Sequence, residues 1–161
     1  MAFRVLIVAN GFVQDAPESF PPDVRKLFEQ PHEVRVLVPT RTGRLAWLTS
    51  DTGPATREAS ALVSDILADM QRKGIERPPS GHVGDENQVL AIQDALVQFS
   101  ADAIVVVAHV RGQDGWHERH VIERAREQLG LPVYVVPITA KGEVISPPPN
   151  EALHGRGAST A

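Results

Sequence analysis

The sequence predicts a single α/β domain with a parallel sheet, and three observations lead to that prediction. Short apolar runs alternate with segments whose apolar residues recur at helical spacing. The run at residues 103–108 is continuously apolar and rich in β-branched residues, as expected of a strand covered by helices on both faces. A length of 161 residues suits one domain with a substantial core. Right-handed crossovers would then make the strands parallel.

The most regular stretch begins at Gly81. Residues 81–85 predict a short strand, a glycine turn and a helix start, with Asp85 as the helix cap and Gln88 returning a bond to it. Apolar residues at helical spacing follow, at Val89, Ile92, Leu96 and Phe99. The strand at 103–108 comes next, after a break at residues 100–102.

The stretch continues with a predicted glycine-bearing loop from His109 to Gly115. A helix is expected over Trp116–Leu129, ended by Gly130 and by Pro132 beyond it. Val133–Ile138 is a further apolar strand, so the whole segment is predicted to alternate strand, helix, strand, helix, strand.

The first half has the same alternation in weaker form. Phe3–Ala9 predicts a strand that ends at Asn10-Gly11, and Pro22–Glu29 predicts a short helix. Glu33–Pro39 alternates as a strand does. Asn10-Gly11 also has a simpler interpretation, as a turn made of residue types that tolerate positive φ.

Pro54 opens a strongly amphipathic helix that Gly74 ends. Pro78-Pro79 cannot lie in a central strand, so the third strand is expected to be short and at an edge. The polar loop before this helix holds Trp47, which either covers the core edge or stacks on a ligand base. Arg41 and Arg44 in the same loop either meet phosphates or are solvated. We predict that residues 1–140 form the domain and that 141–161 form a flexible tail.

Composition excludes several classes of protein. The net charge of -4 gives no basic footprint for nucleic acid. With no cysteine, disulfides and thiolate metal sites are excluded. No apolar run approaches the length of a membrane span, and Met1 leads directly into a strand, so we expect a cytoplasmic protein without a membrane partner.

The order of several short motifs resembles the universal stress protein family, within the adenine-nucleotide α-hydrolase-like group. These motifs are Gly84-Asp85 before a helix, Ala101 to Val106 entering a strand, the Gly112 and Gly115 pair, and Leu131 to Val136 at the last strand. Trp116 and Arg119 after the glycines make the chain most similar to the small actinobacterial branch. The resemblance covers roughly residues 3–138, most strongly in the second half.

The resemblance implies a three-layer α/β/α domain with a five-stranded parallel sheet of order 3-2-1-4-5. An adenine nucleotide, ATP or AMP with Mg²⁺, would lie in the crevice at the carboxyl ends of the first and fourth strands. Asn10 and His109 would face this crevice, and the Val38 backbone would contact the adenine. The family usually has Asp where this chain has Asn10.

The resemblance places the phosphates on the backbone of Gly112 and Gly115. In the family, a spacer of fixed length separates the second glycine of the pair from a Gly-Ser or Gly-Thr dipeptide. In this chain the same spacer after Gly115 leads to Ala125 and Arg126, so the dipeptide is absent. When the chain is instead aligned with the family backwards from its last strand, Arg119 and His120 occupy the positions of this dipeptide. They would then lie on the first turn of a helix, where their side chains would contact phosphate. The alternative is that both belong to an exposed polar helix face.

We predict no metal site and no catalysis. His117 and His120 share a helical face, but with or without His109 this pair lacks a third ligand of fixed geometry. The chain has no Gly-x-Ser-x-Gly motif of the kind that carries a hydrolase nucleophile. It also has no P-loop motif of an NTPase and no NAD-binding Gly-x-Gly-x-x-Gly motif after its first strand.

Two functions therefore stay open. The first is a module that binds an adenine nucleotide in a signalling or stress-response role without turnover. The second is a stress-associated dimer or scaffold that binds no nucleotide and needs no cofactor. In either case we expect a homodimer through Val133–Ile138, an apolar strand that would otherwise be an unpaired edge.

Overall fold

The structure of the protein is a computed structural model. It describes residues 3–30, 32–40, 53–71, 79–85, 87–109 and 112–145, and for residues 53–55 and 112–118 it describes only the backbone. Five parallel strands form one sheet in the order β3-β2-β1-β4-β5. The predicted α/β fold and strand order are thereby confirmed.

The strands are short and apolar, as their sequences predict. They are β1 (Phe3–Ala9), β2 (His32–Pro39), β3 (Ser80–Gly84), β4 (Ala103–His109) and β5 (Val133–Ile138). The bounds of β1 and β5 are those expected from the sequence, and β3 is a short edge strand as Pro78-Pro79 suggested. β1 lies at the centre, between β2 and β4, and its last five residues are buried because helices cover both faces.

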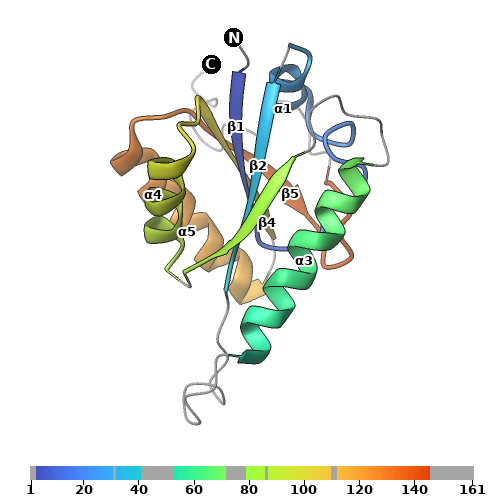
Figure 1. Ribbon diagram of the computed structural model, residues 1–161, viewed down its shortest axis with the longest axis vertical. Coiled ribbons are helices and arrows are strands. Elements are labelled where there is room, and N and C mark those ends of the chain that lie inside the picture. The colour runs from blue at the N-terminus through green and yellow to red at the C-terminus, as the bar shows by residue number, and fades with distance from the viewer. Residues whose placement is uncertain are drawn as a thin grey trace.

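Helices cover the sheet on both sides (Figure 1). α1 (Pro22–Arg25), its continuation as the 3-10 helix η1 (Lys26–Phe28), and α3 (Gly53–Gln71) pack on one face. α4 (Gln88–Gln98) and α5 (Gly112–Leu129) pack on the other. Alternate strand residues feed the two cores: Val5 and Ile7 point toward α3, whereas Leu6 and Val8 point toward α4 and α5. The layers follow directly from this alternation.

Glycines let both helical layers approach the edge strand β3. A Cβ at Gly81 would lie 2.7 Å from Val63 Cγ1 on α3, and a Cβ at Gly84 would lie 2.9 Å from Ala91 Cβ on α4. Contacts of this kind are too short for any side chain. β3 is therefore held close to both α3 and α4.

The start of α4 differs from the prediction. Asn87 is the N-cap, and its side chain accepts a hydrogen bond from the Leu90 N–H at 3.2 Å. Asp85 instead accepts from the Asn87 N–H at 2.8 Å, which orders the turn before the helix. The predicted capping role of Asp85 was therefore wrong, and Gln88 Oε1 is buried without a hydrogen-bond partner among the described residues.

After β5 the chain turns back onto the domain. Val144 pairs with Ile138, and Gly142 lies in a turn with φ of 84°. The Gln14 N–H donates to the Gly142 carbonyl at 3.1 Å, so this turn packs against the loop after β1. Residues 141–145 of the predicted tail thus contact the domain, and residues 146–161 lie outside the described part.

Candidate functional site at the carboxyl ends of the strands

A hollow of about 230 Å³ opens where β1 and β2 end. Its described lining comes from both strand ends and from one flank of α3: Ala9, Asn10, Val38, Pro39, Glu58, Ala59 and Leu62. Two of the predicted site residues, Asn10 and Val38, therefore lie together here. Five of the seven described lining residues have apolar side chains, and the other two supply one amide and one carboxylate, so the described lining includes no cation.

Asn10 is fixed by the neighbouring strand. Its backbone N–H and its side-chain Nδ2 both donate to the Val107 carbonyl, at 3.1 and 3.0 Å. The residue is only 8% exposed, so its amide group is held in one orientation. The side-chain oxygen has no hydrogen-bond donor among the described residues, and it is the group left to accept from a ligand. Positive φ in the described chain occurs elsewhere, at Asp15, Gly130 and Gly142, so a positive-φ turn does not explain Asn10-Gly11.

Gly11 allows His109 to lie over the end of β1. A Cβ on Gly11 would lie 3.2 Å from the Cε1 and Nε2 atoms of His109 and 3.1 Å from Ile138 Cδ1. The structure therefore places His109 beside the Asn10-Gly11 turn, as the topology predicted. His109 does not belong to the described lining of the hollow, which lies on the α3 side.

The predicted glycine-bearing loop from His109 to Gly115 is wrong in its second half, because α5 begins at Gly112. Gly112 and Gly115 lie in the first turn of this helix. The Gly112 N–H is still among the helix-end donors that lack an intrahelical acceptor, whereas Gly115 is the fourth helical residue, where the helical hydrogen bonds begin. Glycine is disfavoured inside helices but is acceptable in a first turn, which is why the sequence pattern suggested a loop.

The expected first-turn position of Arg119 and His120 is also wrong. With α5 starting at Gly112, these residues lie about 10–12 Å along the helix from its first residue, at a rise of about 1.5 Å per residue. Both are exposed on the helix surface. The structure thus separates them from the end of the helix where a phosphate would bind.

No sequence motif marked the residues that α3 contributes to the hollow. Glu58, Ala59 and Leu62 lie at i, i+1 and i+4 on the first half of this helix, so one turn of α3 forms one wall of the hollow. The helical periodicity of the sequence identified the buried face of α3. Which turn of α3 lies at the end of β2 depends on the angle at which the helix crosses the sheet, and the periodicity does not give that angle. Trp47, Arg41 and Arg44 lie outside the described residues.

No metal centre emerges from the part of the chain that the structure describes, where no group of three or more His, Asp or Glu side chains converges. The His117 side chain lies outside that part. Among the described helices, none combines the length and the apolar character that a bilayer crossing requires.

Comparison with known proteins adds no assignment. No protein-family model matches the chain, and no curated protein matches its sequence.

Proposed function

We propose that the protein binds an adenine nucleotide at the carboxyl ends of β1 and β2, in a signalling or stress-response role without turnover. The observation that carries this proposal is the hollow lined by Asn10, Val38 and Glu58. Ligands of parallel α/β sheets bind outside the carboxyl ends of the strands, and this hollow lies there.

The size and charge of the hollow indicate which part of the ligand it would hold. At about 230 Å³ it is below the roughly 300–1,000 Å³ of sites that enclose a whole ligand. Among its described lining residues the one charged side chain is Glu58, which repels phosphate and accepts hydrogen bonds from hydroxyl or amino groups. The nucleoside would therefore occupy the hollow, with the phosphates outside it toward the start of α5.

A thermal-shift titration with adenosine, AMP, ADP and ATP, with and without Mg²⁺, tests this proposal. Binding to the native state alone raises the stability by about 2.7 kcal/mol at one hundred times Kd. We expect saturable shifts that weaken in Glu58→Gln and in Ala59→Met, which narrows the hollow. Asp65→Asn, an exposed change on the same helix, is the control. No shift at millimolar nucleotide in the unmodified protein would refute nucleotide binding.

The second candidate is a dimer or scaffold without nucleotide. Two observations favour it: Asn10 Nδ2 already donates to Val107, and the predicted phosphate loop is helical. β5 is an edge strand, with Tyr134 and Val135 only partly buried. Light scattering tests dimerisation, and a monomer at working concentration would count against this candidate.

A further inference from the structure

At the opposite, amino-terminal end of the sheet, two arginines share one aromatic ring. The guanidinium carbons of Arg4 and Arg35 lie 5.3 and 5.2 Å from the centroid of the Phe99 ring. Phe99 caps the end of α4 and is 4% exposed, so the ring is fixed in the core. Stacking on a buried ring holds both cations in place.

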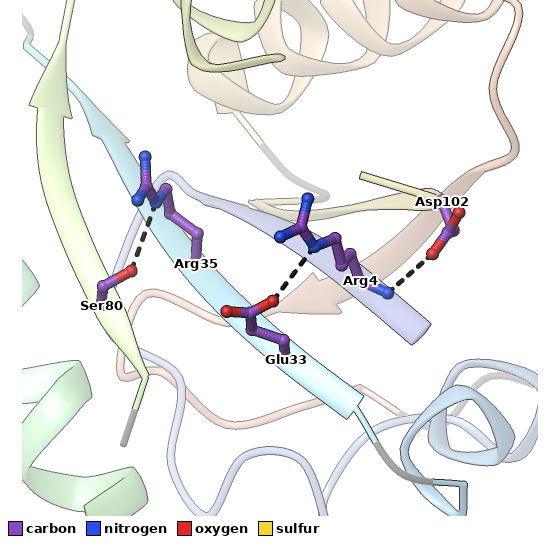
Figure 2. A network of polar contacts seen from close by, with 5 residues as sticks. All are labelled: Arg4, Glu33, Arg35, Ser80 and Asp102. Carbon is purple, nitrogen blue, oxygen red and sulfur yellow. Dashed lines mark hydrogen bonds and ion pairs between the residues drawn. The ribbon is translucent and has the colours of Figure 1, made fainter. Parts of the chain in front are cut away.

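The hydrogen-bond acceptors near these two arginines engage only the Nε donor of each guanidinium group. Arg4 Nε donates to Glu33 Oε1 at 3.1 Å, and Arg35 Nε donates to Ser80 Oγ at 3.2 Å (Figure 2). The terminal amino groups of both arginines have no hydrogen-bond acceptor among the described residues. In Figure 2 both guanidinium groups extend toward the same side of the strands.

Within the described residues, the nearby carboxylates leave Arg35 without a counter-charge. Glu33 pairs with Arg4, and Asp102 Oδ2 accepts from the Arg4 backbone N–H at 2.8 Å. The partner of Arg35 is a neutral hydroxyl, although Arg35 is itself partly buried. A partly buried cation without a carboxylate is unfavourable, and a second cation held on the same ring adds repulsion.

Two further hydrogen-bonding groups lie beside Arg35. Ser80 Oγ accepts from Arg35, so its hydroxyl proton can be donated to a third group. His82 follows Ser80 by two residues on β3 and therefore faces the same side of the sheet. Burial, and then the nearby charge of Arg35, lowers the pKa of His82.

We propose that Arg35, Ser80 and His82, with Arg4 beside them, bind a phosphate group at the amino-terminal end of the sheet. The terminal nitrogens of Arg35 would form the paired contact that guanidinium makes with phosphate oxygens, and the Ser80 hydroxyl would donate a further bond. The ligand is free phosphate or a small phosphate monoester. This site is independent of the proposed nucleotide site, which lies at the other end of the strands.

The test follows the imidazole signals of His82 by NMR during titration with inorganic phosphate at constant ionic strength. His82→Asn identifies these signals among those of the six histidines. We expect a saturable shift and a rise in the pKa of His82 as the anion offsets the Arg35 charge. Arg35→Gln should weaken binding by about tenfold or more, as loss of a charge-assisted bond predicts. Ser80→Ala should weaken it less.

Controls separate this site from general charge effects and from the hollow. Arg25→Gln removes an exposed cation on the opposite layer and should leave phosphate binding unchanged. Adenosine, which carries no phosphate, should not compete. Glycerol 2-phosphate distinguishes a site open to monoesters from one for the free ion. The proposal fails if chloride produces the same shift, if Arg35→Gln binds phosphate as well as the unmodified protein does, or if His82 does not respond.

Discussion

The two ends of the sheet are built by different means. At the carboxyl ends, backbone and small residues come close together: Asn10 bonds to the Val107 carbonyl, and Gly11 lies against His109. At the amino ends, long charged side chains converge on one ring, with Arg35 left short of acceptors. The first end offers a small hollow with a carboxylate in its described lining, and the second offers cations. The two proposed ligands, a nucleoside and a phosphate group, would therefore be recognised at opposite ends.

The largest expected effect breaks the close packing at the carboxyl end. Gly142→Ala would place a Cβ 2.4 Å from the Phe12 carbonyl oxygen, at a φ of 84°. We expect the free energy of unfolding to fall by about 2–4 kcal/mol, from conformational strain and the clash together. Gly130→Ala is the matched control, because Gly130 has φ of 66° and no atom within 4 Å. Equal losses in urea denaturation would show that the clash contributes nothing.

A second change at the same end tests the orientation of Asn10. Asn10→Asp removes the Nδ2 donor and turns a negative charge toward the Val107 carbonyl. We expect a loss of about 1–3 kcal/mol at neutral pH, since a buried polar group loses its partner. Gln14→Glu, a change at an exposed amide, should cost less. If Asn10→Asp is as stable as the unmodified protein, the Val107 bond does not determine the residue at this position.

A third prediction concerns the turn that leads from β3 into α4. Loss of the N-cap in Asn87→Ala should cost about 1 kcal/mol. Asp85→Ala should cost less, because Asp85 orders only the preceding turn. Thermal denaturation of the two variants compares them directly, and the reverse ranking would restore Asp85 as the helix cap.

The smallest effect belongs to the amino end and depends on pH. Folding lowers the pKa of His82 below its usual value of 6.5, so the unfolded chain binds more protons. The stability linked to His82 is therefore complete above pH 6.5 and is lost as the pH falls through the folded pKa. His82→Gln should flatten this part of the stability curve, and Arg35→Gln should flatten it in part. A profile that is unchanged in His82→Gln would rule out this linkage.

The apolar runs made the fold predictable, because strands such as Phe3–Ala9 are recognised from consecutive residues alone. The topology also led to Asn10, and the family resemblance led to Val38; the sheet brings these two residues together at one edge. Local signals failed where two residues compete for one role, as Asp85 and Asn87 do for the helix cap. Gly112 and Gly115 suggested a loop, but glycine occurs both in loops and in the first turn of a helix, so its presence does not show where the helix begins.

The remaining site residues depend on packing that a sequence does not display. Glu58 lines the hollow only because one turn of α3 crosses the end of β2. Arg4, Arg35 and Phe99 belong to three separate elements, and each alone is an ordinary strand or helix-end residue. Only the sheet register, which aligns Leu6 with Arg35, brings the two arginines onto neighbouring positions of one face.

The central place of β1 also has a consequence for how the chain folds during synthesis. β1 pairs on one side with β2, which follows soon after it, but its other partner is β4. The Arg4 to Asp102 bond joins residues 98 positions apart. While a ribosome is still making β4, one side of the central strand has no partner, and open strand edges promote misassembly. A nascent chain halted before β4 should therefore depend on chaperones more than one halted after β5.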